Sequence, residues 1–125
     1  MNLLEEYHIA WLIENAAEKA DHYPIVKLFL PGTDFVWLLT HIESSNRHIA
    51  YGLFDLGDLN PKMGYFDLDK IQKLKGKFGL PLMRDKLFVP RYPISVYEVA
   101  AKDSCMITEK VRDLNFYASY LSRQR

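Results

Sequence analysis

Three runs rich in β-branched and aromatic residues, separated by short turns, constrain the fold of this chain more than any other feature of its sequence. They cover residues 25–30, 35–42 and 48–56. Pro31-Gly32 separates the first two runs and favours a tight turn, because proline presets one backbone torsion and glycine accepts a positive φ. Polar residues 44–47 separate the second run from the third. Short turns join antiparallel neighbours, so the sequence predicts an antiparallel meander of three strands.

Further strand signals follow the meander. An irregular loop over residues 55–62 precedes a fourth short strand around residues 63–66, and residues 86–89 are predicted as a fifth strand. Within the third strand, Gly52 marks a bulge or the close approach of another backbone.

Two helices are expected in the first three quarters of the chain. Apolar residues at three- and four-residue spacing predict a helix within the first 20 residues, with Asn2 and Glu5 as reciprocal caps, and the stripe is Ile9, Leu12, Ile13, Ala16, Ala17 and Ala20. A shorter helix should begin after an Asp67 cap and stop near Gly76.

Two more helices are expected at the end of the chain. Ser95 and Glu98 have the spacing of a capping box, which predicts a helix through Ala101. A C-terminal helix is predicted over about residues 104–122, and its apolar stripe is Ile107, Val111, Leu114, Ala118 and Leu121.

The size and composition of the chain fit one domain with a buried core, since 49% of its 125 residues are hydrophobic. We therefore predict a single α+β domain over residues 1–125. It should contain a small antiparallel sheet of four to five strands, an N-terminal helix, short connecting helices and a C-terminal helix.

The sequence also indicates a compartment. Cys105 is the single cysteine, so an intrachain disulfide and a multi-cysteine metal site are both excluded, which favours a reducing environment. The first 20 residues carry Glu5 and Glu6 and lack the basic start of a signal peptide. No apolar run approaches the roughly 18 residues needed to span a bilayer. We expect a cytoplasmic protein that does not bind membranes.

Several catalytic motifs are missing from the sequence. The four histidines lack the spacing of a metal-binding helix, the glycines match no nucleotide-binding loop, and no serine has the setting of a nucleophile elbow. We expect no cofactor and no bound metal. One enzymatic alternative remains, in which Asp55, Asp58 and Asp85 together bind a divalent ion for phosphodiester hydrolysis. Loop aspartates also commonly stabilise turns.

The formal net charge of zero conceals an uneven distribution. Residues 1–60 contain three basic and nine acidic side chains, a net charge of about −6, whereas residues 61–125 contain thirteen basic and seven acidic ones, about +6. The stretch 62–91 is the most basic, with an excess of five positive charges. Clustered lysines bind phosphates or acidic protein surfaces. The alternative is an ordinary solvated face, because lysines late in a helix complement its dipole.

Aromatic residues interleave with this basic stretch, and two interpretations of them stay open. They either stack on nucleic-acid bases or belong to the core, and they are Tyr65, Phe66, Phe78, Phe88 and Tyr92.

A family resemblance is carried by several short segments in a fixed order. They are Tyr23-Pro24-Ile25-Val26-Lys27-Leu28-Phe29, Trp37-Leu38-Leu39-Thr40, Tyr51-Gly52-Leu53-Phe54-Asp55-Leu56-Gly57, Gly64-Tyr65-Phe66-Asp67-Leu68, and Gly79-Leu80-Pro81 continuing through Arg84-Asp85 to Phe88. In these segments, over about residues 22–100, the chain resembles a bacterial family known as domain of unknown function 2958.

The resemblance implies an accessory role in a bacterial mobile genetic element, because similar members are commonly encoded on plasmids and conjugative elements beside antirestriction and DNA-processing genes. It singles out Lys27, Trp37, Thr40, Asp55, Tyr65, Arg84 and Asp85. Members often have Glu after the matching threonine and Thr before the matching tryptophan, where this chain has His41 and Val36. An activity that needs that carboxylate would lack it here.

These observations favour a non-enzymatic module that binds nucleic acid, an acidic protein surface or a DNA-processing protein through residues 62–91. The candidate binding residues are Lys27, Trp37, Thr40, Tyr65, Lys70, Lys73, Lys75, Lys77, Arg84, Lys86 and Arg91. One alternative is the metal-dependent hydrolase described above. Another is an inhibitor that docks on a protein through the C-terminal helix, where Phe116, Tyr117 and Tyr120 extend the apolar stripe.

Overall fold

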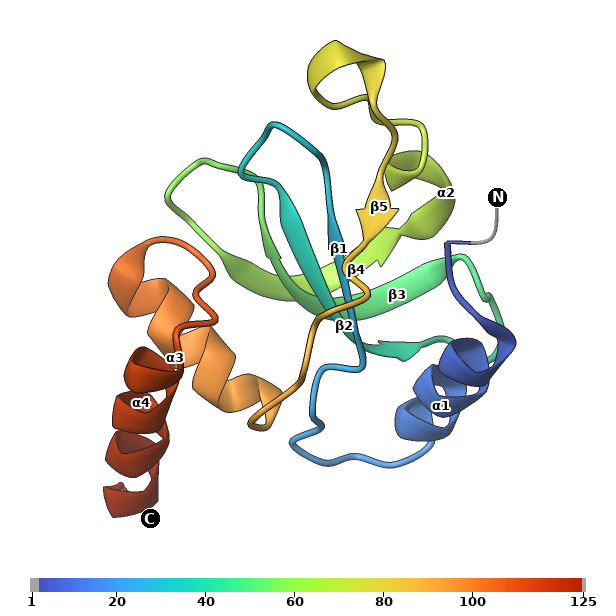
Figure 1. The fold of residues 1–125 in the computed structure, drawn as a ribbon. Helices are drawn as coiled ribbons and strands as arrows, with labels where there is room; N and C mark the ends of the chain where they lie inside the picture. Colours follow the sequence, from blue (N-terminus) through green and yellow to red (C-terminus); the bar gives the residue numbers. More distant parts are fainter. Residues whose placement is uncertain (1–2, 125) are drawn as a thin grey trace.

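In the computed structural model, which describes residues 3–124, an antiparallel sheet lies between one helix and a pair of helices (Figure 1). The sheet has five strands in the order β4-β3-β2-β1-β5. The strands are β1 (Val26–Phe29), β2 (Val36–Ile42), β3 (Ile49–Asp55), β4 (Lys62–Asp67) and β5 (Met83–Arg84). The helices are α1 (Glu6–Ala16), α2 (Leu68–Ile71), α3 (Ile94–Ser104) and α4 (Val111–Arg123), with a short 3-10 turn, η1 (Lys77–Gly79), before β5. The α+β prediction is confirmed.

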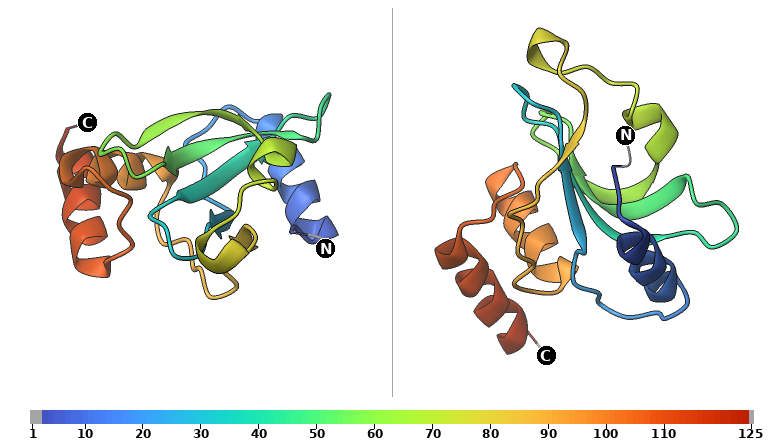
Figure 2. Two further views of the ribbon diagram at one scale, coloured as in Figure 1. Left: turned by 90° about the horizontal axis from the view of Figure 1, so that it is seen from above. Right: turned by 45° about the vertical axis from the view of Figure 1, so that its right-hand side comes forward.

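Two hydrophobic cores form on opposite faces of the sheet, because side chains alternate along each strand. On β2, Trp37 and Leu39 pack in the core that contains Leu12 of α1, whereas Leu38 packs in the core that contains Leu114 of α4. α3 lies between the sheet and α4, so the layers run α1, sheet, α3, α4 (Figures 1 and 2).

The predicted meander is confirmed, since β1, β2, β3 and β4 pair successively in antiparallel register. The register between β2 and β3 shifts between Leu39 and His41, opposite Gly52. A Cβ atom on Gly52 would lie 1.8 Å from the carbonyl oxygen of Leu38. Gly52 therefore permits the close backbone approach that its position in the sequence indicated.

The fifth strand was predicted at residues 86–89 and lies instead at Met83–Arg84. These two residues pair with Phe29 and Leu28 of β1. The chain then turns, because the Asp85 carboxylate accepts a hydrogen bond from the Leu87 backbone N–H at 2.9 Å. The apolar residues of the predicted strand consequently lie beyond the sheet.

The predicted capping box between Ser95 and Glu98 is wrong. α3 begins at Ile94, and the Ser95 backbone N–H donates to Asp21 at 3.1 Å, while its hydroxyl donates to the same carboxylate. Glu98 pairs with Lys102 on the next turn at 2.9 Å. The Asp21 carboxylate, in the connection between α1 and β1, thus accepts hydrogen bonds at the start of α3.

The ends of three other helices also differ from prediction. α1 ends at Ala16, so Ala17 and Ala20 lie beyond it, and α2 ends at Ile71, ahead of Gly76. The reciprocal cap of α1 involves Glu5 and His8, whereas Asn2 lies outside the described residues. α4 begins at Val111 and not near residue 104, because Cys105 adopts a left-handed conformation (φ 62°) that ends α3.

Within residues 3–124, no helix is both long enough and apolar enough to cross a membrane.

Candidate functional site

Four of the predicted lysines lie on α2 and the loop that follows it, residues 68–81, which we call the basic lobe. They are Lys70, Lys73, Lys75 and Lys77, all exposed. Among the described residues, none of the four forms an ion pair. The neighbouring aspartates are occupied: Asp67 accepts hydrogen bonds from the backbone at the start of α2, and Asp69 pairs with His48 at 3.0 Å.

The end of the basic lobe is held in a defined conformation by backbone hydrogen bonds. Gly76 N–H donates to Leu80 at 2.7 Å, and Lys77 N–H donates to Pro31 at 2.8 Å. A Cβ atom on Gly76 would lie 2.3 Å from the Pro31 carbonyl oxygen, so only glycine allows this contact with the turn between β1 and β2. The loop is therefore fixed to the end of the sheet.

Phe78 lies at the tip of this loop and has two unfavourable features. Its side chain is 89% exposed, and its backbone is left-handed (φ 59°, ψ 24°). A left-handed conformation costs a residue other than glycine about 1–2 kcal/mol, and exposure forfeits the gain from burying a large ring. Lys77 Nζ lies 5.4 Å from the ring centroid. The tip thus presents an aromatic ring beside a cation, as nucleic-acid stacking surfaces do.

A second exposed apolar residue of this kind is found in the loop between β3 and β4. Leu59 is 74% exposed and also has a positive φ of 61°. This loop, the turn between β1 and β2 and the loop of Phe78 lie at the same end of the sheet (Figures 1 and 2). Lys62, which begins β4, is exposed at that end as well.

Lys27, Arg84 and Asp85 converge elsewhere, at the β1–β5 edge near α1, beside a polar cleft of about 250 Å³. The Lys27 ammonium lies 3.4 Å from Asp85 and also pairs with Glu109. Arg84, whose side chain is 14% exposed, lies 3.6 Å from a Glu5 oxygen. Both cations are thus compensated by carboxylates.

His8 completes this network as a neutral acceptor. Its Nδ1 atom lies 3.0 Å from Arg84 Nη1 and accepts the Glu5 backbone N–H at 3.1 Å. Burial and then the positive charge of Arg84 lower the pKa of His8, and Glu5 opposes them. The network joins α1 to the edge strand β5.

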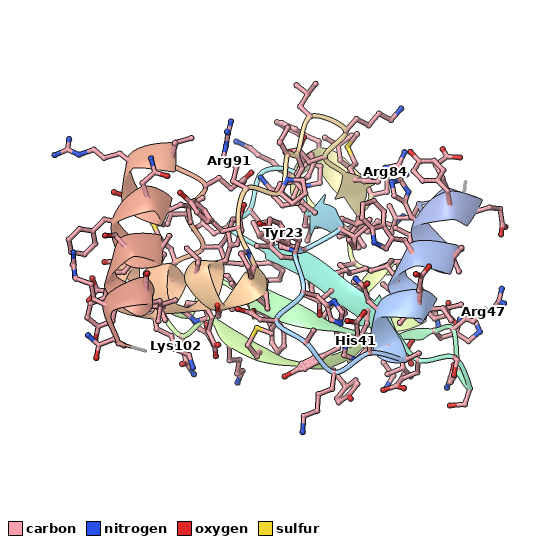
Figure 3. All side chains as sticks on the ribbon, turned by 90° about the horizontal axis from the view of Figure 1, so that it is seen from below. Tyr23, His41, Arg47, Arg84, Arg91 and Lys102 are labelled. Carbon is pink, nitrogen blue, oxygen red and sulfur yellow. The ribbon has the colours of Figure 1, made fainter. Side chains whose placement is uncertain are left out.

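The remaining predicted cations do not belong to the basic lobe. Lys86 lines the polar cleft, and Arg91 lies beyond β5, ahead of α3 (Figure 3). The basic stretch of the sequence therefore divides in space, and its middle part, residues 70–77, lies on the basic lobe.

The three candidate catalytic aspartates are separated. Asp55 is 4% exposed, and its two oxygens accept backbone N–H groups of Gly57 at 2.9 Å and Ile107 at 3.2 Å. Asp85 follows β5, and its N–H donates to the Lys27 carbonyl of β1, so strands β1 and β2 lie between it and Asp55 on β3. Asp58 accepts the Asn60 N–H in an exposed turn. Across residues 3–124, no three His, Cys, Asp or Glu side chains are grouped to hold a metal ion.

The other residues singled out by the resemblance have different surroundings. Trp37 is buried in the core beneath α1, and the buried Thr40 hydroxyl donates to the Tyr51 carbonyl at 3.1 Å. Tyr65 is 59% exposed and lies with His41 in a cleft of about 530 Å³, which we call the His41 cleft. His41, one of the two positions at which the chain differs from the pattern that the resemblance implies, lines this cleft.

The aromatic residues of α4 divide between its two faces. Phe116 and Tyr120 are exposed, whereas Tyr117 is half-buried and its hydroxyl donates to Asp103. Docking through this helix remains a prediction.

Two features of the candidate sites were outside the reach of sequence reasoning. The sequence placed Phe78 in a basic stretch, but only the backbone reveals its left-handed, exposed position. The His41 cleft combines residues from α1, the following connection and three strands, among them His22, Glu43 and Tyr51, which no motif links.

Comparison with known proteins adds a family but no activity. A family model described as protein of unknown function (DUF2958) matches residues 3–108. This match extends past the 22–100 stretch at both ends, includes α1 and α3, and stops before α4. No curated protein and no solved structure matches the chain.

Proposed function

The chain belongs to the family of proteins of unknown function DUF2958, and we propose that it is a non-enzymatic module that binds single-stranded nucleic acid through the basic lobe. Phe78 carries this proposal. Its left-handed backbone is strained, and its exposed ring gains nothing from burial in a core, so neither feature stabilises the fold. Such a residue is explained by a contact with a ligand. An accessory role in a bacterial mobile element is part of the proposal and rests on the family resemblance alone.

The chemistry of the lobe favours a single strand as the ligand. Successive bases stack on exposed aromatic rings regardless of sequence, and lysines follow the backbone phosphates. Phe78 supplies the ring and Lys77 a cation beside it, while Lys70, Lys73 and Lys75 extend the positive surface toward α2. A paired duplex offers no free base faces along its length, so it would use only the lysines.

Fluorescence anisotropy with labelled single-stranded and double-stranded DNA of equal length tests the proposal. The logarithm of the association constant should fall with the logarithm of salt concentration with a slope of about −3 if four lysines contact single-strand phosphates. Phe78→Ala should weaken single-strand binding by about 5- to 100-fold. Duplex binding should change little.

Matched variants distinguish binding through the basic lobe from a general effect of positive charge on the protein. Reversal of Lys73, Lys75 and Lys77 to Glu should abolish binding. Reversal of Lys110, which caps α4, and of Arg112 and Arg123 on α4 makes the same charge change outside the lobe and should preserve most of the binding. Leu87→Ala removes an equally exposed apolar side chain away from the lobe. Absence of binding at low salt, or equal effects of the two reversals, would refute the proposal.

A further inference from the structure

The His41 cleft lies on the opposite end of β2 from the turn that contacts the basic lobe, so it is a separate site. Its floor is the α3-side face of the sheet, where His41, Tyr51 and Tyr65 occupy neighbouring positions on β2, β3 and β4. Ile94 of α3 and the end of α1 with the connection that follows it line its sides. Its volume of about 530 Å³ is large enough for a small organic group or a side chain.

The three rings of the floor pack against one another, and Tyr65 is the most exposed of them. The ring centroids of Tyr51 and Tyr65 are 4.7 Å apart, those of His41 and Tyr51 are 4.9 Å apart, and those of His41 and Tyr65 are 5.9 Å apart. No ligand fits between rings at these separations. Tyr65, the exposed member of the group, therefore offers a face on which a planar or cationic group can stack.

The charges of the cleft favour a cation. Besides His22 and His41, its lining contains two acidic side chains, Glu18 and Glu43, and one basic side chain, Lys19. Glu43 faces the Tyr65 hydroxyl, and hydrogen bonding to this carboxylate raises the pKa of Tyr65. The carboxylate thus lies near the hydroxyl end of the Tyr65 ring, and both side chains line the cleft. Burial lowers the pKa of His41, so the imidazole is neutral at pH 7.5 and does not repel a cation.

The walls of the cleft are fixed by contacts with both neighbouring helices. Asn15 Nδ2 at the end of α1 donates to the Thr40 carbonyl at 3.0 Å. The Ile94 N–H at the start of α3 donates to the His22 carbonyl at 2.8 Å, and His22 Nε2 donates to the Glu18 carbonyl at 2.6 Å. A ligand would enter a site whose geometry is already formed, which reduces the ordering cost of binding.

We propose that the His41 cleft binds a guanidinium group, which stacks on the exposed ring of Tyr65 and donates hydrogen bonds to the Glu43 carboxylate. Guanidinium is planar, stacks on aromatic rings and carries donors in a fork that matches a carboxylate. An ammonium group shares the charge but lacks the planar face. The group belongs either to a free arginine-like compound or to an arginine side chain of a protein.

Calorimetric titration of the full chain with N-acetyl-arginine amide tests this site, with the citrulline and lysine amides as comparisons. Citrulline has the same shape without the charge, and lysine has the charge without the plane. We expect saturable binding of the arginine compound, at least about tenfold weaker binding of the lysine compound, and none of the citrulline compound. A parallel titration with Gly-Gly-Arg-Gly-Gly separates the two sources: tighter binding of the peptide identifies a protein arginine, and equal or weaker binding identifies a small molecule.

Variants locate the site. Glu43→Gln and Tyr65→Ala should each weaken binding about tenfold, whereas Glu14→Gln and Tyr120→Ala, which change exposed residues on α1 and α4, should have no effect. Circular dichroism confirms that each variant is folded. Three results would overturn the proposal. They are no saturable binding up to about 10 mM, equal binding of the arginine and citrulline compounds, and cleft variants that both bind as tightly as the original chain. None of these outcomes depends on DNA binding by the basic lobe.

Discussion

The Asp55 carboxylate accepts a hydrogen bond from the backbone N–H of Ile107 at 3.2 Å, although 52 positions separate the two residues in sequence. Its other oxygen accepts the Gly57 N–H at 2.9 Å. Asp55 therefore ties the end of β3 to the connection between α3 and α4. This structural role accounts for a buried aspartate that the sequence offered as a catalytic candidate.

Asp55→Ala should lower the free energy of unfolding by about 2–4 kcal/mol, because two backbone donors at a buried site lose their acceptor. Chemical denaturation measures this change. Asp58→Ala is the matched control, since Asp58 lies in an exposed turn and accepts the Asn60 N–H of its own loop, and it should cost under about 1 kcal/mol. Equal losses for both variants would contradict the assignment.

Gly52→Ala should be among the most destabilising single substitutions in the sheet. The new Cβ would lie 1.8 Å from the Leu38 carbonyl oxygen, so the backbones of β2 and β3 must separate, at a cost of about 3 kcal/mol or more. Gly64→Ala, on the adjacent strand, places its Cβ 3.3 Å from the Phe54 ring and should cost less. Thermal unfolding of the two variants compares them, and a milder effect at Gly52 would show that the bulge adjusts.

The sheet was predictable because its signals are local. Runs rich in β-branched and aromatic residues and the Pro31-Gly32 turn indicate the meander without help from distant residues, and Gly52 marked the site of a bulge or close approach. The edge strand β5 was misplaced because it has two residues, and pairing with β1 determines its position. The start of α3 was misassigned because Asp21, far away in sequence, replaces the expected local cap.

The candidate sites were less predictable because they depend on distances between elements. The lysines of the basic lobe are close in sequence and remained together. Lys27 and Arg84 resemble free cations in the sequence, but carboxylates from other elements compensate them. No local pattern links His41, Tyr51 and Tyr65, which strand register makes neighbours.

Phe78→Gly should separate binding from stability. Glycine accepts the left-handed backbone without strain, so this variant should be more stable than Phe78→Ala by about 1 kcal/mol, measured by chemical denaturation. Both variants should lose single-strand binding to a similar extent, because both remove the ring. If Phe78→Gly unfolds more readily than Phe78→Ala, the left-handed conformation is not the source of strain.

The stability of the fold should depend on the protonation of His41. Burial lowers its pKa, the charge of nearby His22 lowers it further, and Glu43 opposes both. Tyr51 and Tyr65 pack on the ring, and Glu18 and Lys19 also line the cleft. As the pH falls below about 6.5, the ordinary pKa of histidine, the unfolded chain takes up the proton before the folded chain does. The contribution of His41 to the free energy of unfolding therefore declines through this range and levels off below the folded-state pKa.

His41→Gln isolates this contribution, because glutamine keeps hydrogen-bonding capacity and does not titrate. The difference in free energy of unfolding between the original chain and the variant should be constant above about pH 7.5. As the pH is lowered to about 5, the original chain should lose free energy of unfolding relative to the variant. Urea denaturation at a series of pH values measures it. A difference that stays flat, or that moves in favour of the original chain at low pH, would show that the folded protein does not disfavour the charged imidazole.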